Sequence, residues 1–155
     1  MYLLVDNVYV DSRLLKEKRY CNYEKCRGAC CKGEGLGTPL SDIDIKRIDK
    51  NVSEPNFYEY NKGPRLVCRK NGDCIFLRDN MCKINHIKPD FCRLFPVRFE
   101  RKDGFNFIIF HPYSECRFEE SDKYYLERIS DIIEREFGKN FTQKLLELCG
   151  NVYLQ

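Results

Sequence analysis

Residues 21–31 read CNYEKCRGACC, so that four cysteines fall within eleven residues. Cysteine thiolates are soft, charged donors that bind zinc, iron and iron–sulfur centres, and four of them satisfy a tetrahedral ion or a cubane cluster. The stretch therefore predicts a metal-binding loop around which the rest of the chain is organised. Cys30 and Cys31 are adjacent, and in a regular helix or strand their side chains would point in different directions. Unless the backbone turns sharply there, one of them serves another centre or the core.

A second group of cysteines, Cys74, Cys82 and Cys92, follows later in the chain. An Asn-Gly turn signal precedes this group, and a hairpin of two short strands around residues 78–80 is expected to bring Cys74 close to Cys82. A Pro-Asp step then begins a short helical turn that carries Cys92. We expect these three thiols to converge.

The expected metal ligands come from both groups and from one later position. They are Cys21, Cys26, Cys30, Cys31, Cys74, Cys82, Cys92 and Cys116. Eight thiolates suit two centres of four ligands each, whereas six suggest one centre with spare thiols. Cys149 ends an amphipathic segment and is expected to be a small buried apolar residue. Cys68 fits either role.

Other polar residues lie close to these cysteines. His86 and His111 each stand near a candidate ligand, but a hydrogen-bonded structural histidine is commoner than a metal ligand or a proton carrier. Lys88 and Arg93 place positive charge beside Cys92, which predicts that the pKa of this thiol is lowered and that the thiolate is favoured.

Ten cysteines could instead form five disulfides. Secreted disulfide scaffolds carry a signal peptide, whereas residues 1–10, MYLLVDNVYV, lack a basic start and a clear cleavage site and hold Asp6 inside the apolar stretch. This favours a cytoplasmic protein with reduced cysteines, although the disulfide-rich intracellular proteins of hyperthermophiles leave the alternative open. No apolar run approaches the roughly 20 residues of a membrane span, so we expect a soluble protein with no membrane partner.

The charge of the chain is close to balanced. Lysine and arginine number 27 and aspartate and glutamate number 24, which gives a formal net charge of +3. This balance argues against a dedicated nucleic-acid surface and favours a protein partner. The oligomeric state is left open.

The expected fold is α+β, a single small domain over residues 1–155 with short antiparallel hairpins and metal-binding loops, covered by two C-terminal helices. Ser41 and Asp44 form a capping-box signal for a helix that ends near Asn51. Asp103-Gly104 is a type I′ turn candidate between two strands. Residues 1–10 are expected to form a strand or a small hairpin. Further strands are expected at residues 66–68, 74–77, 81–84, 97–102 and 105–110. Expected C-terminal helices run from a cap at Ser121 to Phe137 and from Phe141 to Cys149.

CNYEKCRGACC, followed by GDCIFLRDNMCKINHIKPDFCRLFP, resembles the YkgJ-type cysteine-cluster family, whose members are described as zinc- or iron-chelating and which is named for a Cys-x2-Cys-x2-Cys-Cys signature. The resemblance covers Cys21 to Pro96. The first spacings are x4 and x3 here rather than x2 and x2, and Lys88 stands where the family usually has arginine. The resemblance implies metal chelation without an agreed reaction, and some relatives are described as flagellin lysine N-methylases.

These observations favour an intracellular metal-binding protein with a cysteine-ligated iron–sulfur or iron centre and a redox or accessory role. A zinc-stabilised, non-catalytic protein-interaction module is the alternative. A methyltransferase-like enzyme is a third reading, based on the resemblance alone. Its only candidate nucleotide loop, Gly33 to Gly37, lacks the strand-to-helix context of such loops. The sequence contains no Ser-His-Asp order, paired carboxylate motif or His-Glu-x-x-His segment, so whether the chain is an enzyme is left open.

Overall fold

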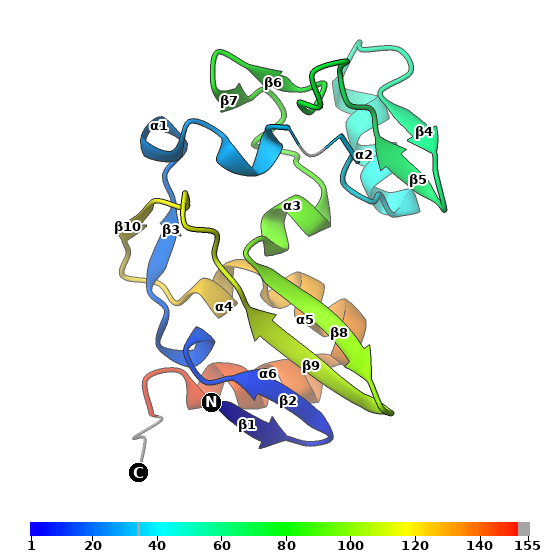
Figure 1. The fold of residues 1–155 in the computed structure, drawn as a ribbon. Coiled ribbons are helices and arrows are strands. Elements are labelled where there is room, and N and C mark those ends of the chain that lie inside the picture. Colours follow the sequence, from blue (N-terminus) through cyan, green and yellow to red (C-terminus); the bar gives the residue numbers. More distant parts are fainter. Residues whose placement is uncertain (34, 152–155) are drawn as a thin grey trace. The chain divides into compact units, whose positions relative to one another are not determined.

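A computed structural model of the protein describes residues 1–33 and 35–151 (Figure 1). Its contacts divide the chain into two compact units. The sheet unit comprises Met1–Cys21, Leu94–Ser114 and residues 118–151, and the cysteine unit comprises Asn22–Arg93 and Glu115–Arg117. The expectation of a single domain stays a prediction, because two compact units in one chain can fold together or separately.

The sheet unit is built on four strands in the order β1-β2-β9-β8. The strands are β1 (Tyr2–Val5), β2 (Val8–Asp11), β8 (Val97–Lys102) and β9 (Phe105–Phe110). The predicted hairpin of β8 and β9 is present, and residues 1–10 contribute to a second hairpin, β1 with β2. The turn between β8 and β9 uses Asp103 (φ 52°) and Gly104 (φ 82°), the left-handed conformations that a type I′ turn requires. The two hairpins join through a parallel pairing of β2 with β9, which local sequence signals did not predict.

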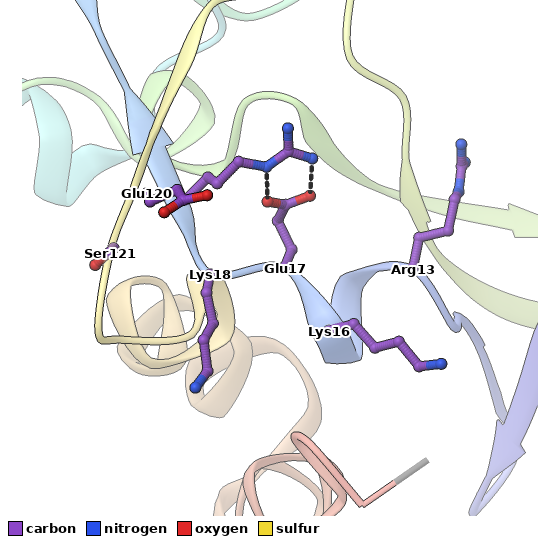
Figure 2. Close-up of a pocket in the computed structure, with 7 residues that line it drawn as sticks. Arg13, Lys16, Glu17, Lys18, Glu120 and Ser121 are labelled. Carbon is purple, nitrogen blue, oxygen red and sulfur yellow. Dashed lines mark hydrogen bonds and ion pairs between the residues drawn. The ribbon is translucent and has the colours of Figure 1, made fainter. Parts of the chain in front are cut away.

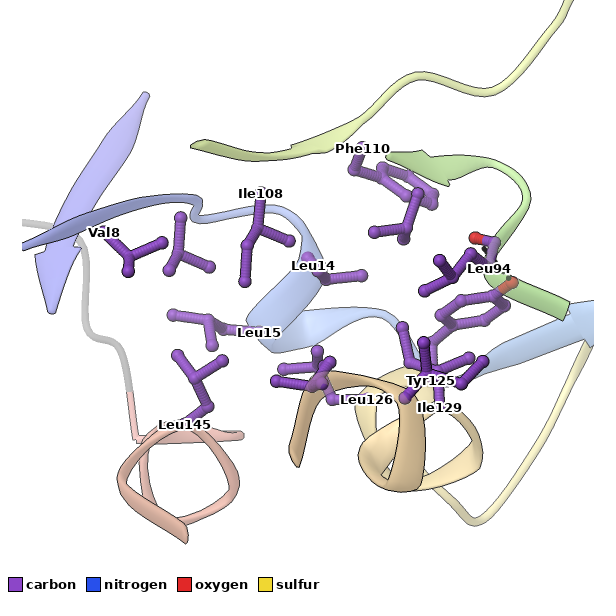
Figure 3. Close-up of a cluster of buried hydrophobic side chains, with 14 of the residues drawn as sticks. Val8, Leu14, Leu15, Leu94, Ile108, Phe110, Tyr125, Leu126, Ile129 and Leu145 are labelled. Atoms are coloured by element: carbon purple, nitrogen blue, oxygen red, sulfur yellow. Dashed lines mark hydrogen bonds between the residues drawn. The ribbon is translucent and has the colours of Figure 1, made fainter. Parts of the chain in front are cut away.

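Short helices cover one face of this sheet. They are η1 (Leu14–Lys16), α4 (Tyr125–Arg128), α5 (Ser130–Phe137) and α6 (Lys139–Leu148). Figure 3 shows Leu14 and Leu15 of η1 between the strand residue Ile108 and the helix residues Leu126 and Leu145, all of which are almost fully buried. The predicted α+β class with C-terminal helices is therefore confirmed. A small two-stranded ladder, β3 (Arg19–Cys21) with β10 (Phe118–Glu120), completes the unit.

The start of the C-terminal helices differs from the prediction. Ser121 is not the helix cap, because α4 begins at Tyr125 and the backbone N–H of its N-cap residue, Tyr124, donates to the Glu127 carboxylate at 2.6 Å. The hydroxyl of Ser121 instead accepts from Arg128 at 2.7 Å. Ile129 then leaves helical geometry, with φ −117° and ψ 10°, and divides the predicted single helix into α4 and α5.

The cysteine unit consists of short elements around a smaller apolar core. The elements are α1 (Tyr23–Cys26), η2 (Ala29–Cys31), α2 (Asp42–Asn51), β4 (Tyr58–Tyr60), β5 (Pro64–Leu66), β6 (Leu77–Arg78), β7 (Met81–Cys82) and α3 (Asp90–Leu94), whose last residue belongs to the sheet unit. Its buried core residues are Leu40, Ile48, Phe57, Leu66, Phe76 and Ile84. The predicted helix and capping box at Ser41 and Asp44 are confirmed.

Within residues 1–33 and 35–151, none of the helices combines the length and the apolar character needed to span a membrane.

Candidate metal centre

The first cysteine group lies on a backbone that turns sharply. α1 is capped by the Asn22 side chain, which accepts from the Lys25 backbone N–H at 2.9 Å. Two successive left-handed residues, Arg27 (φ 53°) and Gly28 (φ 67°), then end α1 and lead into η2. In this one tight turn the thiols of Cys30 and Cys31 lie 3.9 Å apart, sulfur to sulfur. The sharp turn that both would need in order to serve one centre is therefore present.

Gly28 is required by the close packing of this turn. A Cβ atom added there would stand 2.8 Å from Leu77 Cδ1 and 3.2 Å from the backbone oxygen of Asn80. The first cysteine group thus packs directly on the turn between β6 and β7, which belongs to the second group.

Backbone hydrogen bonds join the two groups. The N–H of Cys74 donates to the carbonyl of Cys31 at 2.8 Å, and the N–H of Gly33 donates to the Asp73 carboxylate at 3.0 Å. The strands are shorter than predicted, because Cys74 lies before β6 and forms an isolated antiparallel bridge with Cys68. Cys82 lies in β7, opposite Leu77. The predicted hairpin is nevertheless present and presents Cys74 and Cys82 on either side of its turn.

Cys92 is held by α3. Its thiol donates to the hydroxyl of Thr38 at 3.4 Å. The start of α3 is fixed by the fully buried Asp44, whose carboxylate accepts from the backbone N–H of Asp90 at 3.1 Å. Arg47 donates to the same carboxylate at 2.5 Å and to the carbonyl of Lys88 at 3.0 Å. Sequence reasoning identified Asp44 as a helix cap but not as the residue that positions the Cys92 helix.

The thiols oppose one another's ionisation. The pKa of Cys31 is raised above the ordinary thiol value, first by its hydrogen bond with Cys30, then by burial and by the charges of Cys30, Cys74 and Cys82. Burial, followed by the charges of Cys82 and Cys68, raises the pKa of Cys74 to about 11. Several thiolates can therefore form here together only if a cation neutralises them.

Cys82 and Cys92 belong to the same electrostatic group. Burial raises the pKa of Cys82, the Cys30 charge adds to the effect and the Lys88 ammonium partly offsets it. Burial raises the pKa of Cys92 to about 12, and the charges of Cys30, Cys74 and Cys82 act in the same direction. The prediction that Lys88 and Arg93 would lower the pKa of Cys92 is wrong, because burial is the largest influence on this thiol and raises its pKa.

The structure thus brings five of the eight predicted ligands close enough for their charges to interact, namely Cys30, Cys31, Cys74, Cys82 and Cys92. Their donor set, all sulfur and largely buried, fits zinc, iron or an iron–sulfur cluster. Across residues 1–33 and 35–151, however, no three His, Cys, Asp or Glu side chains already have the arrangement of a metal site. Metal binding would therefore involve rotation of these side chains towards a common point.

The other cysteines are placed as follows. Cys21 lies in β3 of the sheet unit opposite Phe118, Cys26 ends α1, and Cys116 lies in the short Glu115–Arg117 segment of the cysteine unit. Their role as ligands stays a prediction. Cys149 packs against the core of the sheet unit and donates to the carbonyl of Leu145 at 3.5 Å, as expected for a structural thiol. His86 and His111 are both exposed.

A cavity of about 540 Å³ lies elsewhere, in the sheet unit (Figure 2). It contains no cysteine. Glu17 and Arg19, which both line it, form an ion pair with nitrogen–oxygen distances of 2.5 and 2.8 Å. The Lys18 ammonium lies 4.6 Å from the centroid of the Tyr124 ring. The cavity is lined by Arg13, Lys16, Glu17, Lys18, Arg19, Glu120 and Ser121. Its charged groups mix both signs, and no metal-binding chemistry follows from them.

A protein-family model matches most of the chain. The model of the CxxCxxCC family, described as a "putative zinc- or iron-chelating domain", matches residues 20–149. The match includes all ten cysteines and extends well beyond the Cys21 to Pro96 segment that carries the sequence resemblance. Neither a curated protein nor a solved structure matches the chain significantly.

Proposed function

Because the chain belongs to the CxxCxxCC family of zinc- or iron-chelating domains, we propose that its cysteine unit holds an iron–sulfur cluster, or iron, and serves a redox or accessory role. The thiolates that would hold it are Cys30, Cys31, Cys74, Cys82 and Cys92. The observation that carries this proposal is the gathering of five thiols whose charges raise one another's pKa. Such a group keeps its thiols protonated, and a bound cation would stabilise the thiolates by neutralising their charge.

The residues around the thiols suit an electron-transfer centre. An all-sulfur donor set is the usual environment of iron–sulfur clusters, and a bound cluster supplies one-electron transfer at a potential set by burial and nearby hydrogen bonds. The burial that raises the pKa values of Cys74 and Cys92 also limits water at their sulfurs. The Lys88 ammonium lies close enough to Cys82 to favour its thiolate, which supports a centre of negative charge.

A zinc-stabilised protein-interaction module is the second candidate, and the small core of the cysteine unit favours it. Six buried apolar residues form this core, whereas sixteen buried residues form the core of the sheet unit. Structural zinc contributes on the order of 10–16 kcal/mol of apparent binding free energy, enough to make folding of a weak unit depend on the metal. In this case a metal chelator would unfold the cysteine unit.

A methyltransferase-like activity gains no support from the Gly33 to Gly37 loop, whose residue Glu34 lies outside the described residues. The N–H of Gly35 donates to the carbonyl of Gly72 at 3.1 Å, and that of Gly33 donates to Asp73. Gly37 lies so close to Leu66 that an added Cβ would overlap its backbone oxygen. Gly37 therefore serves close backbone packing, and the hydrogen-bonded amides of Gly33 and Gly35 are not available to bind a phosphate.

The decisive experiment measures the metal directly. The full chain is purified anaerobically from iron-replete cells, and iron, acid-labile sulfide and zinc are determined per chain together with the visible absorption spectrum. We expect iron with matching sulfide and a broad brown absorption. Colourless protein with one or two zinc ions would instead support the interaction module.

A matched pair of variants links the metal to the proposed site. Cys31→Ala removes a thiol that interacts with Cys30, Cys74 and Cys82, whereas Cys149→Ala removes a thiol of the sheet unit. We expect Cys31→Ala to lose most of the metal and Cys149→Ala to retain it. If neither metal is present in the unaltered chain, or if Cys31→Ala retains a full complement, the proposal is wrong.

A further inference from the structure

Cys68 and Cys74 face each other across a tight turn. The N–H of Arg69 donates to the carbonyl of Asp73 at 2.8 Å, and the N–H of Ile75 donates to the carbonyl of Val67 at 3.0 Å. These two bonds flank the Cys68–Cys74 bridge, which makes the two cysteines a directly opposed, non-hydrogen-bonded pair. In such pairs the Cα atoms lie about 4.5 Å apart and the side chains project from the same face.

This spacing is the one that a disulfide needs. Disulfide-bonded cysteines usually have Cα atoms roughly 4.4–6.8 Å apart, so Cys68 and Cys74 could be joined without a large backbone movement. The turn is also rigid, because the Gly72 N–H donates to the carbonyl of Arg69 at 2.8 Å and the Arg69 side chain donates to the carbonyl of Ile75 at 3.0 Å. Lys70 and Asn71 at its tip are exposed, and Cys68 is partly exposed beside them.

Cys74 is therefore positioned between two competing roles. Its backbone and its electrostatic interactions connect it with Cys31 and Cys82, on the side of the proposed metal centre. Its bridge connects it with Cys68, which is not among the predicted ligands. A sulfur engaged in a disulfide carries no thiolate charge and is lost as a metal ligand.

We propose that Cys68 and Cys74 form a reversible disulfide in the presence of a small-molecule disulfide such as oxidised glutathione, and that this modification withdraws Cys74 from the metal centre. One cysteine thiolate attacks the glutathione disulfide and releases one glutathione, and the other thiolate then attacks the mixed disulfide and releases the second. The two cysteines lose two protons and two electrons, and glutathione disulfide becomes two molecules of glutathione. The metal-release step rests on the proposed function, whereas disulfide formation does not.

Peptide mapping of metal-free full-length protein tests the first step. Trypsin cuts after Arg69 and Lys70, so the two cysteines fall in separate peptides, residues 66–69 and 71–78. After oxidation with glutathione disulfide and alkylation of the remaining thiols, these two peptides are expected to appear joined. Burial raises the pKa of Cys74 to about 11, so the exchange is followed over hours rather than minutes.

Two serine variants serve as matched controls. The joined peptide should be lost in Cys68→Ser and retained in Cys149→Ser, and a reducing agent should separate it. Cys68 and Cys74 recovered as alkylated thiols, or cross-linked to other cysteines, would overturn the proposal.

Zinc-loaded protein tests the second step, with released zinc measured by a coloured chelator. Oxidation should release zinc from the unaltered chain and from Cys149→Ser, and this release should be lost in Cys68→Ser. Complete retention of zinc by protein that contains the joined peptide would overturn the withdrawal of Cys74. Failure of the chain to bind zinc or iron at all would contradict the proposed function, while the peptide map would still decide whether the disulfide forms.

Discussion

Replacing Asp44 with alanine is expected to weaken both the cysteine unit and its hold on metal. The Asp44 carboxylate is fully buried and accepts from the backbone and hydroxyl of Ser41, from Arg47 and from the backbone of Asp90. Loss of a helix cap costs about 0.5–2 kcal/mol. Removal of one partner from a buried ion pair costs about 3–5 kcal/mol, but Arg47 is 26% exposed and Asp90 lies 3.4 Å away as a second acceptor. We therefore expect a total loss of about 3–4 kcal/mol.

Urea denaturation of the metal-loaded chain measures this loss, and competition with a coloured chelator measures the affinity for metal. Asp42→Ala is the matched control, because Asp42 is an exposed acid in the first turn of the same helix and should cost about 0.3–1 kcal/mol. Affinity should fall in Asp44→Ala because the N-terminus of the Cys92 helix loses its anchor at Asp90. If Asp44→Ala costs no more than Asp42→Ala, or if its metal affinity is unchanged, the positioning role of Asp44 is refuted.

Three further predictions follow from the same site. Gly28→Ala should destabilise the chain by about 2–4 kcal/mol, because a left-handed φ costs about 1–2 kcal/mol and the new Cβ would also press on Leu77. Gly33→Ala has the same φ of 67° and nothing within 4 Å of the added Cβ, so it should lose only about 1–2 kcal/mol, the cost of the left-handed φ. Equal losses of the two variants in urea denaturation would contradict this account. Metal affinity should fall by up to about tenfold per pH unit for each ligand thiol as the pH is lowered from about 8 to 6. The reason is that burial raises the pKa of Cys74 to about 11 and that of Cys92 to about 12, and both thiols must lose a proton to bind metal. Chelator competition that shows no dependence on pH would exclude these thiols as ligands. The metal-free chain should lose stability as the pH rises from about 8.5 towards 11, because the folded state keeps the proton of Cys74 over this range while the unfolded state loses it. The free energy of unfolding of the metal-free Cys74→Ser variant, measured by denaturation, should fall less over the same range.

Local signals predicted those parts of the fold whose cause is local. The Asp103-Gly104 turn and the Ser41 cap were placed correctly because both depend on residues within four positions of each other. The parallel pairing of β2 with β9 joins Val8 to Asn106, and no pattern within either strand specifies that partner. The division at Ile129 was missed for a related reason. The apolar periodicity continues through this residue, and only its packing shows that the helix is interrupted.

The candidate site shows the same division between chemistry and environment. Cysteine density predicted the donor atoms, and the expected hairpin placed Cys74 near Cys82, because thiol chemistry and turn signals are visible in the sequence. The direction of the pKa shift at Cys92 was wrong, because charge is visible in the sequence and burial is not. The opposition of Cys68 and Cys74 was missed for the same reason as the strand pairing, since register is fixed by hydrogen bonds that the residue types do not specify.

The distribution of the gathered thiols along the chain bears on why this unit would need a metal. Cys30 and Cys31 lie near the start of the Asn22–Arg93 segment, and the other three thiols lie near its end. A common centre would therefore close the long chain segment between them. Closing such a loop costs conformational entropy that grows slowly with its length, and here it is offset by few backbone hydrogen bonds and a core of six apolar residues. A cation bound by thiolates from both ends would hold the loop closed and remove the repulsion among the sulfurs at the same time. Loss of a single ligand, whether by mutation of Cys31 or by oxidation of Cys74, should therefore weaken the fold of the unit together with its metal affinity.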